Sequence, residues 1–129
     1  MLKKIKYFIQ RGRRGYSDED IWDFHDYLCS ILIPVLKEFS KKNMGCPGEF
    51  WDKESKNDEC HKWSETLEEM SQGFEAAQAL MNMQYFKMKK NEENGCWTRE
   101  NDEEKHKLLT EKYNRGMKLF SENFMSLWD

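Results

Sequence analysis

A run of apolar side chains at helical spacing between residues 58 and 88 constrains the fold more than any other feature of the chain. Its members recur at alternating steps of three and four residues, with one polar interruption: Cys60, Trp63, Leu67, Met70, Phe74, Ala77, Met81, Gln84 and Met88. The segment contains no Pro and one Gly, so little in it opposes a helix. The spacing predicts one amphipathic helix over about 58–90, and such a helix needs partners to cover its apolar seam.

A second segment with helical spacing covers 18–42. It follows Ser17, a residue type that caps helix starts, and its first turn holds three acidic residues that interact well with the free N–H groups. Its apolar stripe consists of Ile21, Phe24, Leu28, Ile31 or Leu32, Val35 and Phe39. Pro34 lies inside the segment and predicts a kink rather than a break, because the stripe keeps its phase across the proline.

Two shorter patterns flank these segments. A turn signal at 91–95 precedes a last helix, for which Thr98 is the predicted cap. The stripe of that helix reads His106, Leu109, Tyr113, Met117, Phe120, Phe124 and Leu127.

Near residue 1, a short helix flanked by lysines carries one apolar face made of Leu2, Ile5, Phe8 and Ile9. Such a helix can lie on a membrane surface, but we expect it to dock onto its own domain.

Together these patterns predict an all-α fold, a helical bundle of three long helices plus a short N-terminal basic amphipathic helix. The 129 residues suffice for a single helical domain, with a basic head at 1–15 and a helical body at 16–129. Charged residues make up 35% of the chain and the mean hydropathy is -0.99, but 14% aromatic residues at helical spacing argue against disorder. The long helix exceeds the needs of such a domain, so we also expect a homodimer or higher oligomer.

The four cysteines bear on the compartment of the protein. Cys29, Cys46, Cys60 and Cys96 permit two disulfides in three pairings. No apolar stretch approaches the roughly 20 residues of a membrane span, and residues 1–9 do not resemble the core of an export signal. We therefore predict four reduced cysteines in a cytoplasmic protein with no membrane association.

Charge is unevenly distributed along the chain. Residues 1–15 carry six basic side chains and no acid, so the rest carries -9 within the overall net charge of -3. Arg11, Arg13 and Arg14 precede the helix start at Ser17, where three guanidiniums could clamp a phosphate. The acidic first turn of that helix offers the same arginines an internal partner, and we favour these salt bridges. Nucleic acid is not an expected partner.

Aromatic residues complete the candidate ligand-binding set, which comprises Arg11, Arg13, Arg14, Trp22, Phe50 and Trp51. Phe50 and Trp51 are adjacent in the polar linker that follows the 18–42 helix. They either anchor this linker on the bundle or line the mouth of a pocket, and we favour the anchoring role.

Patterns that could support metal binding or catalysis are weak. Glu103 and His106, and likewise Asp58 and His61, have the spacing that puts two ligands on one helical face. Both pairs lie at the starts of helices that should run antiparallel, so they would occupy opposite ends of the bundle. No glycine-rich phosphate loop is present. We predict no metal, no cofactor and no enzymatic activity.

Several strings of the sequence are distinctive: Arg11 to Phe24, Gly45 to Phe50, Gly116 to Phe120 and Leu127 to Asp129. In these strings the chain resembles a group of small helical proteins of unassigned activity encoded by tailed bacteriophages and related mobile elements. The resemblance covers about half of the chain and carries over no catalytic residue. It implies a phage gene product that acts inside a bacterial cell, where small phage proteins are often host-directed binders.

Two functions follow as expectations. The first is a non-enzymatic protein that binds a host protein, for example as an inhibitor of antiviral defence. The alternative is a protein that binds or sequesters an anionic small molecule, such as a nucleotide signal, through the basic N-terminal segment.

Overall fold

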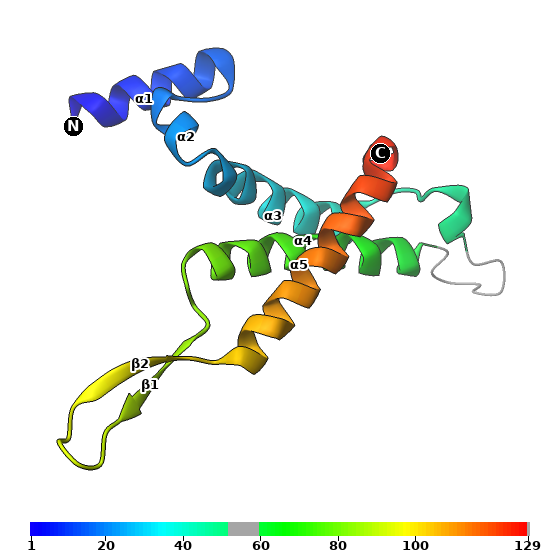
Figure 1. Ribbon diagram of the computed structural model, residues 1–129. Helices are drawn as coiled ribbons and strands as arrows, with labels where there is room; N and C mark the ends of the chain where they lie inside the picture. Colours follow the sequence, from blue (N-terminus) through cyan, green and yellow to red (C-terminus); the bar gives the residue numbers. More distant parts are fainter. Residues whose placement is uncertain (52–59, 129) are drawn as a thin grey trace.

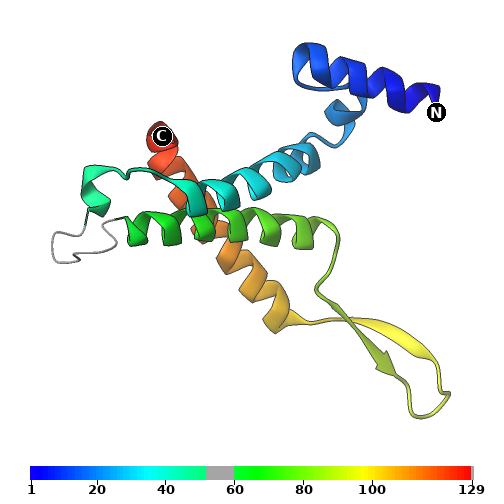
Figure 2. The same ribbon diagram turned by 180° about the vertical axis from the view of Figure 1, so that it is seen from behind.

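The computed structural model describes residues 1–51 and 60–128 and is mostly helical, as predicted (Figure 1). In chain order the elements are α1 (Leu2–Arg14), α2 (Asp18–Trp22), α3 (Phe24–Lys42), η1 (Gly48–Phe50), α4 (His61–Met81), β1 (Phe86–Lys90), β2 (Trp97–Asn101), α5 (Glu103–Asn123) and η2 (Phe124–Ser126). Helices α3, α4 and α5 pack together, while an N-terminal arm formed by α1 and α2 and a hairpin formed by β1 and β2 project from them in both views (Figures 1 and 2).

Helix α4 is the centre of the core and confirms the apolar seam over most of its length. Trp63, Leu67, Met70 and Phe74 are buried on it at the expected spacing. They pack against α3 on one side and α5 on the other, so α4 is the helix that joins the other two. The predicted start of this helix at Asp58 lies outside the described residues. Burial of four large side chains at steps of four, three and four residues explains why this segment is a helix.

Helices α4 and α5 cross at a pair of glycines. A Cβ atom added to Gly116 would lie 2.5 Å from the Cα atom of Gly73, and one added to Gly73 would lie 2.6 Å from the Cα atom of Gly116. Only residues without a side chain permit backbones to approach this closely. The crossing then brings Phe74 of α4 and Phe120 of α5 edge to face, with ring centroids 5.2 Å apart.

The predicted long helix over 58–90 is wrong beyond Met81. Helix α4 ends there, Met83 adopts a left-handed backbone with φ of 54°, and the chain turns into strand β1. Strand β2 pairs with β1 in antiparallel register, so the predicted cap at Thr98 instead lies within a strand. Helix α5 is capped by Asp102, whose Oδ1 atom accepts a hydrogen bond from the Lys105 N–H at 3.1 Å. The described chain is therefore mostly helical, as predicted, with one two-stranded hairpin that the all-α prediction did not include.

The predicted helix over 18–42 is divided, and the face expected in the core is wrong. Asp23, with φ -126° and ψ 56°, separates α2 from α3, while α3 continues through Pro34 without a break. Helix α3 packs on α4 through Cys29 and Leu36, which are buried, together with Leu32, Ile33 and Phe39. Two members of the predicted stripe, Phe39 and the alternative Leu32, do pack against the core. The other members are exposed: Ile21, Phe24, Leu28, Ile31 and Val35.

The expected docking of the first helix onto its own domain is also wrong. Helix α1 has no buried residue; it contacts α2, and its Arg11 guanidinium lies over the Tyr27 ring of α3. Its apolar face therefore remains accessible, with Leu2 and Phe8 the most exposed of its members.

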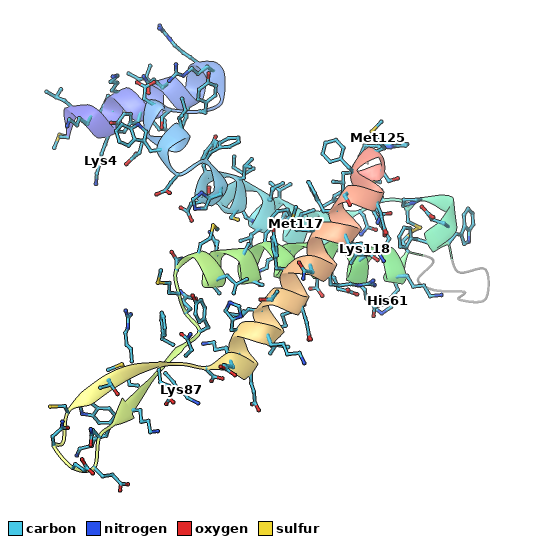
Figure 3. The ribbon with its side chains drawn as sticks, viewed as in Figure 1. Lys4, His61, Lys87, Met117, Lys118 and Met125 are labelled. Carbon is cyan, nitrogen blue, oxygen red and sulfur yellow. A yellow bond between two sulfur atoms is a disulfide. The ribbon has the colours of Figure 1, made fainter. Side chains whose placement is uncertain are left out.

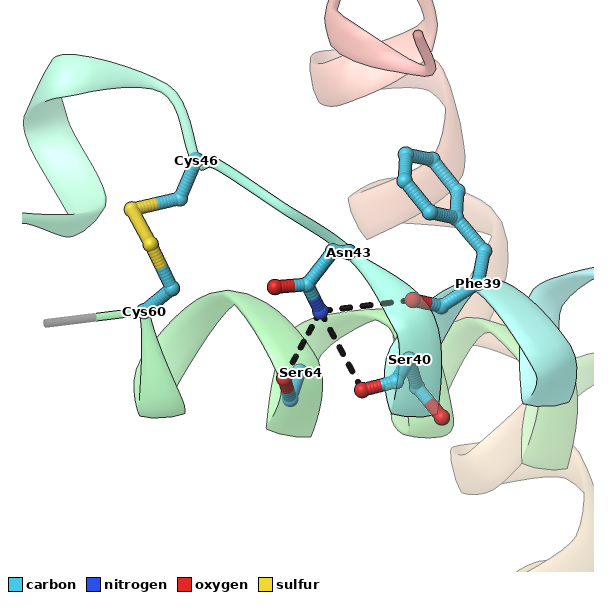
Figure 4. Close-up of a disulfide and its surroundings, with 6 residues drawn as sticks. All are labelled: Phe39, Ser40, Asn43, Cys46, Cys60 and Ser64. Atoms are coloured by element: carbon cyan, nitrogen blue, oxygen red, sulfur yellow. Dashed lines mark hydrogen bonds between the residues drawn. A yellow bond between two sulfur atoms is a disulfide. The ribbon is translucent and has the colours of Figure 1, made fainter. Parts of the chain in front are cut away.

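A disulfide corrects the prediction of four reduced cysteines. Cys46, after α3, is bonded to Cys60, the residue that precedes α4, with Cα atoms 5.6 Å apart (Figure 4). Near it, the Asn43 Nδ2 group ends α3 by donating to the carbonyls of Phe39 and Ser40, and it also donates to the Ser64 Oγ atom of α4 at 2.9 Å. These contacts hold the end of α3 against the start of α4. Cys29 and Cys96 are free thiols.

Candidate interaction surfaces

The junction between α1 and α2 is organised by a nearly buried carboxylate. Asp20 is 5% exposed and closes a capping box with Ser17, whose N–H and Oγ groups both donate to Asp20 Oδ2, at 2.7 and 2.8 Å. The guanidinium of Arg11 donates to both oxygens of the same carboxylate, with Nε at 2.9 Å. Hydrogen bonding by Arg11, and then by Ser17, holds the pKa of Asp20 well below its usual range. The carboxylate therefore remains charged at neutral pH.

A second, more exposed carboxylate receives three side chains of α1. Asp18 accepts hydrogen bonds from Gln10 at 2.7 Å and from Arg14, and Lys6 lies 3.3 Å away. Hydrogen bonds from Gln10 and then Arg14 lower the pKa of Asp18 to about 2. The backbone N–H of Asp18 also donates to Gln10, at 2.9 Å. These reciprocal bonds fix the angle between α1 and α2.

The predicted pairing of the basic head with the acidic first turn is therefore confirmed for Arg11 and Arg14. Both guanidiniums also lie over tyrosine rings, Arg11 over Tyr27 at 5.9 Å and Arg14 over Tyr16 at 4.6 Å from the centroid. Within residues 1–51 and 60–128, Arg13 has no ion-pair partner. The three arginines thus do not converge on a common pocket, and two of them serve to hold the arm together.

The aromatic members of the candidate ligand-binding set lie at opposite ends of α3. Trp22 ends α2 and is largely exposed. Phe50, in η1 at the opposite end of α3, packs on Trp63 with ring centroids 5.0 Å apart, while Trp51 beside it is exposed. The 19 residues of α3 span about 28 Å, so the six predicted residues do not form one site. Phe50 has the anchoring role that we favoured.

The β1–β2 hairpin was missed by sequence reasoning and carries the most distinctive surface of the molecule. Its register places Phe86, Met88, Trp97 and Arg99 on one face. Trp97 is 62% exposed and Met88 58% exposed, and the Arg99 guanidinium stacks over the Phe86 ring at 5.1 Å. We call these four residues the hairpin face. The opposite face is polar and includes Lys87, which projects with the hairpin away from the helices (Figure 3).

A sequence signal for this hairpin was present. Asn94-Gly95 between two alternating segments is a strong hairpin signal, and Gly95 adopts a left-handed φ of 70°. The turn is closed by Asn91, whose N–H donates to the Cys96 carbonyl at 2.8 Å while its own carbonyl accepts from the Gly95 N–H at 2.8 Å. The periodicity that placed Gln84 and Met88 on a helical seam concealed this signal.

A second accessible apolar surface follows the outer side of α2 and α3. Its members share the alternating spacing of three and four residues, and they are Ile21, Phe24, Leu28, Ile31 and Val35. All five are exposed, from 39% at Leu28 to 61% at Ile21. We call these residues the outer stripe. It lies beside a shallow hollow of about 530 Å³ that Pro34, Val35 and Glu38 help to line.

Helices α3, α4 and α5 also diverge around an apolar cleft of about 320 Å³. It is lined by residues that include Leu28, Cys29, Phe74, Leu80 and Met117. Burial raises the pKa of the Cys29 thiol, so this sulfur is protonated at neutral pH and unsuited to act as a nucleophile. The cleft therefore suits apolar contact rather than catalysis.

The two weak metal-ligand spacings noted in the sequence gain no support from the described residues. Over 1–51 and 60–128, no three His, Cys, Asp or Glu side chains lie close enough together to hold a metal ion. His106 packs edge-on against Tyr85 with centroids 4.7 Å apart, and Asp58 of the other motif lies outside the described residues. None of the helices that the structure describes is long and apolar enough to cross a membrane.

Comparison of the chain with known protein families, with functionally described proteins and with solved structures found no match.

Proposed function

We propose that this chain is a small, non-enzymatic phage-type protein that binds a host-cell protein, and that the hairpin face is its primary docking surface. The proposal depends on one observation: an exposed Trp, Met and Arg, with a partly exposed Phe, are gathered on one side of a projecting ribbon. Trp, Phe, Met and Arg are enriched in protein interfaces, and Trp and Arg are enriched among the residues that contribute most to binding. A surface of this composition at the end of a projection can enter a recess on another protein.

Charge on the hairpin indicates the chemistry of that partner. The strand segments 86–90 and 97–101 hold three lysines and Arg99 against a single acid, Glu100. The partner surface that complements them has an apolar recess bordered by carboxylates. Opposite charges of this kind increase the rate of association and align the two proteins.

The backbone of the hairpin offers a second contribution to binding. The described sheet has two strands, so each strand has one edge whose N–H and C=O groups are not used in the ladder. A partner strand can add to such an edge. A hairpin of two strands is also only marginally stable in water, so a partner that extends the sheet stabilises it.

The alternative function, capture of an anionic small molecule by the basic head, is less well supported. Arg11 and Arg14 already bind Asp20 and Asp18, so an anion would have to displace two carboxylates. We therefore place host-protein binding first.

The test is capture of a partner by the tagged protein followed by measurement of affinity with the purified partner. We expect Trp97→Ala and Arg99→Glu each to weaken binding tenfold or more, because Arg99 lies in the central pair of the hairpin face and Trp97 is its most exposed apolar side chain. Thr98→Ala is the matched control, since Thr98 lies on the same ribbon but on its polar side and carries no charge. Equal binding by all three variants and the parent would refute the assignment of this surface.

A further inference from the structure

We infer that the outer stripe is the interface of a homodimer, in which the α3 helices of two copies pack antiparallel about a two-fold axis. The inference is independent of the proposed function, because it leaves the hairpin face accessible. The first observation that supports it is the total solvent-accessible area of the chain. The accessible area is 10207 Å², whereas a compact monomer of 15.7 kDa exposes about 7,300 Å². The excess, about 2,900 Å², is larger than the roughly 800 Å² that each partner contributes to a standard interface.

The spacing of the outer stripe suits another helix. Alternating steps of three and four residues produce the knobs that interlock between paired helices. The sequence reading placed this stripe in the core for that reason, yet α4 occupies a different face of α3. Apart from Leu28, which also lines the cleft beside α4 and α5, the stripe is therefore helix-packing surface for which the described part of the chain supplies no helix.

The outer stripe is self-complementary, so it can pack against the same stripe of a second copy of the chain. The positions Phe24, Leu28, Ile31 and Val35 are separated by four, three and four residues, and this order is the same in both directions. An antiparallel two-fold arrangement consequently sets Phe24 against Val35 of the other copy and Leu28 against Ile31. A two-fold interface requires this kind of self-complementary patch. The hollow beside Val35 and Pro34 gives the large Phe24 ring of the other copy a place to pack.

Charge along the same segment selects the antiparallel direction. Several charges of the segment 18–42 are already paired within the chain, namely Asp18, Asp20, Lys37, Glu38 and Lys42. Of the charges that form no ion pair within residues 1–51 and 60–128, Glu19 and Asp26 lie toward the start of the segment and Lys41 lies at its end. Antiparallel pairing places the acidic start of one copy beside the basic end of the other. Parallel pairing would place like charges together, which is unfavourable.

The first test is the mass of the full chain by sedimentation equilibrium, with helix content followed by circular dichroism. We expect twice the chain mass of 15.7 kDa for the parent, and the single chain mass with unchanged helix content for Ile31→Glu. Phe8→Glu is the matched control, because it adds the same charge to an exposed apolar side chain of α1 outside the stripe. It should remain a dimer. A monomeric parent, or a folded Ile31→Glu variant that remains dimeric, would overturn the inference.

The second test reports register and does not depend on the Ile31→Glu variant folding. Leu28→Cys and Ile31→Cys are made separately in a Cys96→Ser background and oxidised alone and as a mixture. The antiparallel register predicts covalent dimers chiefly in the mixture, since position 28 faces position 31 of the other copy. Covalent dimers of Leu28→Cys alone would indicate a parallel pair, and no covalent dimer in any sample would exclude this interface. A monomeric parent that loses capture of a partner with Ile31→Glu would assign the stripe to that partner.

Discussion

The closest approach in the core, between Gly116 and Gly73, gives the sharpest test of the fold. In Gly116→Ala the new Cβ atom would lie 2.5 Å from the Gly73 Cα atom, 3.0 Å from the Glu69 carbonyl oxygen and 3.1 Å from the Gly73 nitrogen. Carbon atoms in favourable contact are about 3.5–4.0 Å apart. All three neighbours belong to the backbone of α4, so no side-chain rotation can relieve the contact. Helices α4 and α5 must separate by about 1 Å.

The net cost follows from two opposing effects. Overpacking of a close-packed core costs about 1–3 kcal/mol, and a backbone-to-backbone contact belongs at the upper end of that range. Alanine in place of glycine within a helix favours folding by about 1 kcal/mol. We therefore expect Gly116→Ala to lower the free energy of unfolding by about 2 kcal/mol. Separation of the helices should also loosen the edge-to-face contact of Phe74 with Phe120.

The assay is urea unfolding followed by circular dichroism at 222 nm, with Gly12→Ala as the matched control. Gly12 is also a helical glycine, but an added Cβ atom there would meet nothing within 4 Å. This variant should be as stable as the parent or slightly more stable, because it keeps the propensity gain without the clash. If Gly116→Ala is as stable as Gly12→Ala, the crossing of α4 and α5 at these glycines is wrong.

Three further predictions concern the disulfide and the arm. Cys46→Ser should lower the free energy of unfolding by about 3 kcal/mol, since the disulfide closes a loop with a sequence separation of 14, whereas Cys96→Ser should leave thermal unfolding unchanged. Because folding lowers the pKa of Asp18, its contribution to stability is present above the unfolded pKa of about 3.9 and is lost as pH falls toward about 2. Protection of the α1 amides from exchange, corrected for the intrinsic rate, should therefore fall over that interval. Asp18→Asn should remove the Asp18 part of this pH dependence and leave the part that Asp20 contributes, since folding also lowers the pKa of Asp20. Arg11→Ala should accelerate amide exchange in α1 and α2 while exchange in α4 stays slow, because the partners of Arg11 are Asp20 of α2 and the Tyr27 ring near the start of α3; equal acceleration in α4 would contradict a local role.

The candidate surfaces show where sequence reasoning succeeds and where it does not. The pairing of Arg11 and Arg14 with the first turn of α2 was predictable, because the partners are within ten residues of each other and a capping box at Ser17 fixes the turn. The hairpin was not predicted, because Met88 fits both a helical step of four and a strand alternation with Lys87. The disulfide was not predicted either. Cys46 and Cys60 meet because the end of α3 packs beside the start of α4, and spacing alone does not reveal this.

The sequence by itself determined that the chain is mostly helical and which side of α4 is buried, because helical periodicity is a local property. Trp63, Leu67, Met70 and Phe74 are buried where their spacing predicted. The tertiary structure alone decided which side of α3 packs on α4. Helix α3 has two apolar sides, one through Phe24 and Val35 and one through Cys29 and Leu36, and either could have been the core by hydrophobicity. The choice depends on how the helices fit together in three dimensions, including the glycine crossing that sets the position of α5, and shape complementarity of this kind is not expressed in the period of a single helix.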